Sequence, residues 1–229
     1  MANSAATDPP ATCASLAARF AYSALQRGES AAIYIFDEMP QVYLERSANL
    51  GMNLQPYLNS GQLYLQQLDP AEEPPGEFVN NIRTRVAQHN ATVVVIDSLN
   101  GCLNAMPGEE YLQLQMHELL TFLGMQGVST FLLLAQQGVM SPMQTSIDLS
   151  YLADTIILVR YFEACGAIRK AISIFKKRSG PHESTIRELR IELGNITVGE
   201  SLTEFQGVLT GVPRYAGEPG AWTRVSDAE

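Results

Sequence analysis

The apolar run Thr92–Ile96 constrains the fold of this chain more than any other segment. Its sequence, TVVVI, shows no alternation of polar and apolar residues, and its β-branched side chains favour an extended strand. A strand that is apolar on both faces has to be covered on both faces, which is typical of a parallel sheet with helices on either side. The sequence therefore predicts an α/β fold with residues 92–96 inside the sheet.

Strand-like and helix-like segments alternate along much of the chain. Apart from 92–96, strands are expected at 31–36, 62–68, 128–135 and 155–162. Helices, which show apolar residues three and four positions apart, are expected at about 13–27, 40–50, 76–89 and 109–125. This alternation predicts a mostly parallel sheet with helices on both faces.

The pattern changes after residue 154. Three strand-like runs joined by short turns predict an antiparallel β extension at the C-terminal end of the fold. They lie at 155–162, 167–177 and 185–192. Residues 212–229 contain two prolines and are expected to form a flexible tail. We therefore expect one domain over residues 1–211, followed by the tail.

Composition limits which partners the chain is expected to bind and in which cellular compartment it is expected to lie. The net charge of −9 does not provide the broad positive field that non-specific nucleic-acid binding needs, so no nucleic-acid partner is expected. No apolar run reaches the roughly 18 residues of a membrane span, and the first residues lack the apolar segment of a signal peptide. The three cysteines lie far apart, as is usual in a reducing compartment. The chain is expected to be cytoplasmic, with no membrane partner.

Acidic residues follow two of the predicted strands. Asp37 and Glu38 come directly after the strand at 31–36, and Asp97 comes directly after Ile96. The carboxyl ends of parallel strands meet at one edge of a sheet, where ligands bind in open α/β folds. A carboxylate after a buried apolar strand is typical of a Mg²⁺ site in nucleotide hydrolases. Each acid could instead cap the helix that follows it, and that alternative stays open.

A local cationic strip stands out on this acidic chain. All three lysines, Lys170, Lys176 and Lys177, lie within eight residues of one another, and arginines and His182 follow them up to Arg190. Such a strip indicates an anionic partner such as phosphate. The alternative is a solvated face of a hairpin.

Four segments, taken in order, resemble the KaiC-like branch of the RecA-superfamily P-loop ATPases, especially the second domain of bacterial two-domain KaiC-like proteins. The segments are FDE at 36–38, VVVIDSLNG at 93–101, DLSYLADTIILVRYFE at 148–163 and FKKRSGPHESTIREL at 175–189. The resemblance runs from about Ser15 to Tyr215. It implies a RecA-like fold and ATP hydrolysis with Mg²⁺ at the subunit interfaces of a ring.

The resemblance also implies roles for individual residues. Asp97 corresponds to the acid that coordinates Mg²⁺, and Asp37 and Glu38 to the paired acids that activate the attacking water. Because the side chain of Asp37 is shorter than the usual Glu, Glu38 is the better candidate. The implied nucleotide-binding residues are Ser98, the phosphate sensor Gln137 or its neighbour Gln136, and Lys176, Arg178 and His182, which reach a neighbouring subunit's phosphates.

One feature of the family is missing from the sequence. A P-loop needs two glycines, a lysine and a hydroxyl in the pattern G-x-x-x-x-G-K-[ST]. The residues that align with it, 7–14, read TDPPATCA, and no Lys occurs before residue 170 and no Gly before residue 28. The strand that should precede the loop is also expected to be missing or degenerate. We therefore expect a truncated or damaged copy whose ATPase activity is impaired.

Three alternatives are considered for the function. The first is an impaired ATPase module, and the second is a pseudo-ATPase that acts by assembly or regulatory binding in signalling. The third, a DNA-binding recombinase, is the weakest. A DNA-binding recombinase would need basic loops, and residues 100–108 and 138–146 contain no Lys or Arg. The resemblance implies as partners further copies in a ring, expected to be a hexamer, or the other domain of a two-domain protein. Two-component signalling proteins are further expected partners.

Overall fold

The computed structural model describes residues 10–69, 74–98, 100, 109–134, 153–164, 166–210 and 213–217. The chain divides into two compact units, which are treated separately below. One comprises Pro10–Ala135 with Leu193–Asn195, and the other comprises the remaining residues. None of the described helices is long and apolar enough to cross a membrane. The expected domain bounds of 1–211 and 212–229 stay a prediction.

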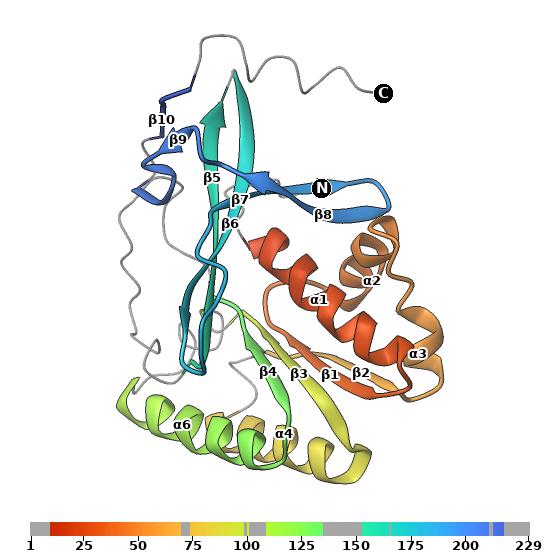
Figure 1. Ribbon diagram of the computed structural model, residues 1–229. Coiled ribbons are helices and arrows are strands. Elements are labelled where there is room, and N and C mark those ends of the chain that lie inside the picture. The colour runs from red at the N-terminus through yellow and green to blue at the C-terminus, as the bar shows by residue number, and fades with distance from the viewer. Residues whose placement is uncertain are drawn as a thin grey trace. The chain divides into compact units, whose positions relative to one another are not determined.

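A four-stranded sheet forms the centre of the first unit (Figure 1). Its strands are β1 (Ser30–Ile35), β2 (Leu63–Gln67), β3 (Ala91–Asp97) and β4 (Ser129–Leu132). The order is β2-β1-β3-β4, and every neighbouring pair is parallel. Ile35 at the end of β1 lies opposite Asp97 at the end of β3, so the acids that follow these strands are brought to one edge.

Helices cover both faces of this sheet, as the sequence predicts. Helix α1 packs against β1 and β3 on one face, and α4 and α6 pack on the other (Figure 1). The helices are α1 (Pro10–Gln26), α2 (Pro40–Asn49), α3 (Gln55–Asn59), α4 (Pro75–His89) and α6 (Glu109–Met125). Four of them match the expected helices closely, whereas the single-turn α3 was not expected. The predicted α/β fold is confirmed.

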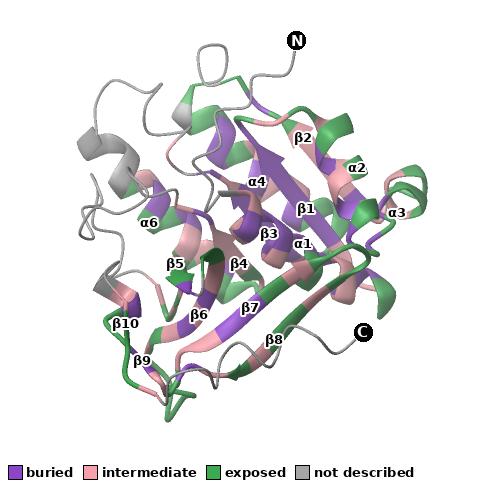
Figure 2. Ribbon diagram, turned by 90° about the horizontal axis from the view of Figure 1, so that it is seen from above, coloured by how far each residue is buried: buried purple, intermediate pink, exposed green. Residues whose placement is uncertain are grey.

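The core of the first unit lies on both faces of β1 and β3, which are purple along most of their length in Figure 2. Ile33, Tyr34 and Ile35 are fully buried on β1, as are Val94, Val95 and Ile96 on β3. Small residues on α1 face this sheet and are equally buried. They are Ala18, Ala21 and Ala24. The unbroken apolar sequence of β3 is therefore explained by burial on both sides.

The second unit contains the predicted antiparallel extension. Its main sheet has the order β5-β6-β7-β8, and β5–β6 and β6–β7 are antiparallel. The strands are β5 (Thr155–Ala164), β6 (Ala167–Lys177), β7 (Arg187–Glu192) and β8 (Asn195–Ser201). A two-stranded sheet of β9 (Phe205–Gln206) and β10 (Arg214–Tyr215) and a 3-10 turn, η1 (Val208–Thr210), follow. β8, β9, η1 and β10 were not predicted.

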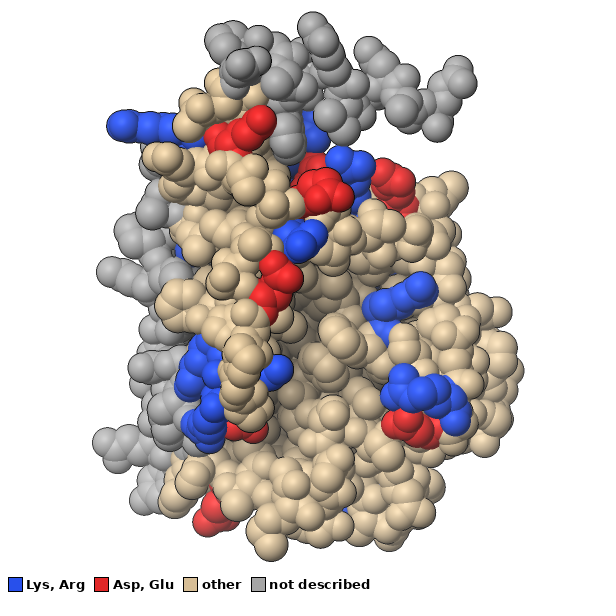
Figure 3. Space-filling model, in the orientation of Figure 1, with Lys and Arg blue, Asp and Glu red and all other residues tan. Residues whose placement is uncertain are grey.

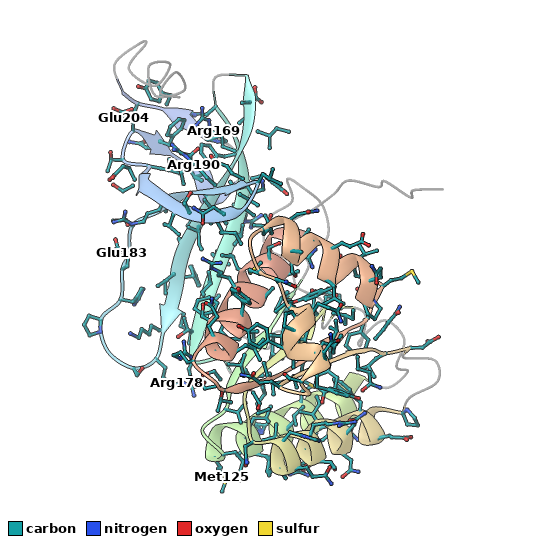
Figure 4. All side chains as sticks on the ribbon, turned by 90° about the vertical axis from the view of Figure 1, so that its right-hand side faces the viewer. Met125, Arg169, Arg178, Glu183, Arg190 and Glu204 are labelled. Atoms are coloured by element: carbon teal, nitrogen blue, oxygen red, sulfur yellow. The ribbon has the colours of Figure 1, made fainter. Side chains whose placement is uncertain are left out.

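A buried carboxylate ties β6 to β7. Glu188 is 5% exposed and accepts a hydrogen bond from Nη1 of Arg169 at 2.9 Å. Its other oxygen accepts from Nε and Nη2 of Arg190 at 2.9 and 2.7 Å. Arg169 and Arg190 are labelled close together at one end of this sheet in Figure 4, and Arg178 is labelled at the other end.

Candidate functional site

The acidic edge of the first unit forms where β1 and β3 end. The N–H of Phe36 donates to the carbonyl of Asp97 at 2.8 Å, which holds the two strand ends together. The hydroxyl of Ser98 donates to Oδ2 of Asp37 at 3.1 Å. Ser98 is buried and Asp37 is exposed. The structure thus brings the predicted acids of both strands to one edge and joins Asp37 to Ser98 directly.

Arg46 on α2 holds Glu38 in place. Its Nε and Nη2 donate to the two carboxylate oxygens of Glu38 at 3.1 and 2.8 Å. Its Nη1 donates to the hydroxyl of Ser15 on α1 at 2.8 Å, and that hydroxyl donates to the carbonyl of Ala11. Only 19% of the Arg46 side chain and 27% of the Glu38 side chain are exposed. One guanidinium therefore links α1, α2 and the end of β1.

Tyr43 lies beneath this guanidinium, with its ring centroid 4.8 Å from Cζ of Arg46. Tyr43 is fully buried, and among the described residues its hydroxyl has no hydrogen-bond partner. Burial raises the pKa of Tyr43; Arg46 lowers it, and Asp97 and Glu38 raise it further. Burial lowers the pKa of Arg46, but Glu38, with help from Tyr43 and Asp97, raises it above its ordinary value. Tyr43 is therefore neutral and Arg46 charged throughout the physiological range.

The acids of this edge do not form a metal site by themselves. Within the described ranges, no three His, Cys, Asp or Glu side chains lie close enough together to hold a metal ion. Mg²⁺ is usually held by one or two carboxylates together with phosphate oxygens, so a metal on Asp97 would need a phosphate beside it. The segment aligned with the P-loop has no Lys or Gly, and Glu38 is engaged by Arg46. Among the described residues, the acidic edge alone does not supply the lysine and the set of carboxylates that would hold Mg·ATP.

The cationic strip belongs to the second unit. Lys176 and Lys177 end β6, and Arg178 and the exposed His182 follow them. Blue side chains gather over this end of β6 in Figure 3, and Figure 4 labels Arg178 there. Nη1 of Arg178 pairs with Oδ1 of Asp154 at 3.1 Å, and its N–H donates to the Asp154 carbonyl at 2.7 Å.

Sequence reasoning missed Arg46, which pairs with Glu38, and Tyr43 and Ser15, which contact Arg46. Arg46 lies eight residues beyond Glu38, and neither this spacing nor the composition of the segment between them marks Arg46 as the partner of Glu38. Its one visible signal is its positive charge, since this part of the sequence contains no lysine and arginine is the only strongly basic residue type there. The predicted sensor Gln137 and its neighbour Gln136 lie outside the described residues.

Comparison with known proteins identifies relatives of this chain. The chain is similar to the circadian clock oscillator protein KaiC of Thermostichus vulcanus, with 24% identity over 199 residues that cover 86% of this chain and 38% of the relative. KaiC of Prochlorococcus marinus is 24% identical over 211 residues, which cover 89% of this chain and 41% of the relative. The chain therefore spans about two fifths of the length of these curated relatives.

The family match covers most of the chain. Residues 12–203 match the family described as "ATPase: KaiC". This range contains the acidic edge, the pair of Arg46 with Glu38, and the cationic strip. The parallel sheet with acids after β1 and β3 and the antiparallel extension agree with the RecA-like fold implied by the resemblance. The chain belongs to the KaiC family of ATPases.

Proposed function

We propose that this chain is a KaiC-family ATPase domain whose own ATP hydrolysis is impaired. Asp97 would be the remnant of the Mg²⁺ acid, with Ser98 beside it at the nucleotide, and Glu38 and Asp37 the remnants of the catalytic pair. The pairing of Glu38 with Arg46 carries this proposal, because Arg46 takes an acceptor position on each carboxylate oxygen and holds the side chain that would have to reach the attacking water.

The missing phosphate cradle supports the same conclusion. A P-loop binds phosphate through backbone N–H groups that glycines expose and through its lysine. Each charge-assisted hydrogen bond contributes about 1.5–3 kcal/mol. Since about 1.4 kcal/mol changes affinity tenfold, losing several such bonds weakens nucleotide binding by orders of magnitude. Asp8 in the aligned segment adds an unfavourable negative charge.

The cationic strip supports a second role, in which the chain acts as an assembly module. Lys176, Arg178 and His182 would reach the phosphates bound by a neighbouring subunit of a ring, where cations stabilise the charge of a transferring phosphoryl group. The Arg178–Asp154 pair is more than half exposed on both sides, so water screens it and it can be exchanged for a phosphate at little cost.

The proposed assembly role requires a particular oligomeric state, compartment and set of partners. A site that borrows cations from a neighbour needs a ring, which we propose to be a hexamer, or the other domain of a two-domain protein. The scattered cysteines and the acidic charge suit the cytoplasm. Gln137 would act as a phosphate sensor there, and two-component signalling proteins are the proposed partners.

A mixing experiment separates the two roles. We expect no ATP hydrolysis by this chain alone. Added to a KaiC-family ATPase with an intact P-loop, it should raise that protein's ATPase rate, and Lys176→Ala/Arg178→Ala should reduce the gain by about tenfold or more. The control is Lys170→Ala, which removes a lysine of the same strand whose ammonium lies over Tyr161. Hydrolysis by the isolated chain would contradict the proposed impairment, and equal effects of both variants would contradict the role of Lys176 and Arg178.

A further inference from the structure

Arg46 is tied to the acidic edge far more firmly than an ordinary surface cation. It makes two hydrogen bonds to Glu38 and one to Ser15, and it lies over the ring of Tyr43. Glu38 and Asp97 both raise its pKa, so it stands within the electrostatic reach of acids that follow two different strands. These contacts come from α1, from α2 and from the segment between β1 and α2, which fixes the planar guanidinium in one orientation.

A second arginine pair in the same unit shows the contrast. Arg27 and Glu29 lie at the other end of β1 and are joined through Nε at 2.6 Å. Their side chains are 61% and 33% exposed, against 19% and 27% for Arg46 and Glu38. Water and salt screen exposed pairs strongly and partly buried bidentate pairs much less. The charge of Arg46 is therefore felt at the acidic edge much more than that of Arg27.

We propose that Arg46 is a positioning residue that serves as the built-in counter-ion of the acidic edge, where it holds Glu38 against α1 and α2 and keeps divalent cations away from the acids. This inference rests on the proposed function and deepens it. The family's chemistry needs a divalent metal at this edge. A fixed guanidinium takes one acceptor position on each oxygen of one acid and repels a second cation nearby.

The consequence for a metal ion follows from charge and access. A divalent cation near Asp97 would lie close to a guanidinium whose positive charge cannot be removed by deprotonation in the physiological range. It would also compete with Arg46 for the two oxygens of Glu38, each of which accepts a hydrogen bond from the guanidinium. Removing the charge of Arg46 frees the carboxylate and ends the repulsion at once, so metal affinity should rise.

Binding of Mn²⁺ alone, followed by electron paramagnetic resonance, tests this inference. We expect Arg46→Gln to bind Mn²⁺ about tenfold more tightly than the unsubstituted chain, or tighter still. Arg46→Lys keeps the charge and should stay within about threefold of the unsubstituted chain. Arg27→Gln makes the same change in net charge at the exposed pair and is the matched control, with no expected gain. Adding Glu38→Gln to Arg46→Gln should remove most of the gain.

Two results would overturn the inference. One is Arg46→Gln binding Mn²⁺ no more tightly than Arg27→Gln, and the other is tight binding at this edge with Arg46 intact. Should Arg46→Gln fail to fold, the Nε–H signal of Arg46 in the NMR spectrum of the unsubstituted chain tests the same point. It should exchange slowly, persist when Mg²⁺ is added and be lost in Glu38→Gln. Loss of the signal on adding Mg²⁺ alone would contradict a fixed pair of Arg46 with Glu38.

These outcomes are distinct from those of the proposed function. A chain that hydrolyses no ATP while Arg46→Gln gains no Mn²⁺ would leave the impaired ATPase standing and remove only the role of Arg46. A chain that hydrolyses ATP with Arg46 intact would contradict the proposed function, whatever the metal titrations show.

Discussion

Phe78→Ala is expected to destabilise the first unit by about 3–5 kcal/mol, the range for large aromatic residues removed from a core. Phe78 on α4 is 1% exposed and packs edge-on against Tyr34 at 5.8 Å and Phe36 at 5.7 Å. Each aromatic pair adds about 0.5–1.5 kcal/mol beyond the buried area. Because Phe36 directly precedes Asp37, the cavity would also loosen the acidic edge. Thermal unfolding followed by circular dichroism should show a midpoint lower by about 10 °C.

The matched control is Phe20→Ala on α1. Phe20 also stacks on an aromatic ring, that of Phe131 at 4.8 Å, but it is 49% exposed. Its removal leaves no closed cavity and should cost only about 1 kcal/mol. Equal losses for the two variants would contradict the placement of Phe78 in the core.

Glu188→Ala is expected to cost about 2–3 kcal/mol in the second unit, because it removes three charge-assisted hydrogen bonds to a buried carboxylate. Arg169 and Arg190 are 22% and 42% exposed, so water compensates part of the loss. Glu188 accepts hydrogen bonds from Arg169 and Arg190, and it lies on β7 opposite Ala171 of β6. β6 also carries Lys176, so weakening this pairing should disturb the cationic strip. Chemical denaturation and the mixing assay described above should both register the loss.

Glu183→Ala provides the comparison within the same unit. Oε1 of Glu183 lies 3.7 Å from Nη2 of Arg187, and the two side chains are 50% and 35% exposed. Exposed pairs of this kind contribute about 0–1 kcal/mol. A cost for Glu183→Ala as large as that for Glu188→Ala would show that burial does not distinguish the two carboxylates.

The main elements of the fold could be predicted because burial leaves a clear pattern in the sequence. β1 and β3 are covered on both faces, so they read as unbroken apolar runs, and the longer helices show the spacing of a covered stripe. The elements that were missed are short or mostly exposed. α3 is a single turn with no buried residue, and β8 (NITVGES) exposes most of its side chains.

The candidate site could be predicted only in part, for a different reason. Acids at strand ends are visible because topology alone brings them to one edge, as the register of Ile35 with Asp97 shows. The partner of Glu38 depends on how α2 is turned, which places Arg46 between Glu38 and Ser15 of α1. Contacts among side chains from three elements leave no periodic signal in a sequence.

Equilibrium titration of this chain with a fluorescent ATP analogue, with Mg²⁺ and with EDTA, tests most directly whether the acidic edge has lost nucleotide binding. The expected result is no saturable binding up to about 1 mM nucleotide under either condition. Asp97→Asn serves as the control that locates any signal and should change nothing. Saturable Mg²⁺-dependent binding in the micromolar range that Asp97→Asn abolishes would contradict the account.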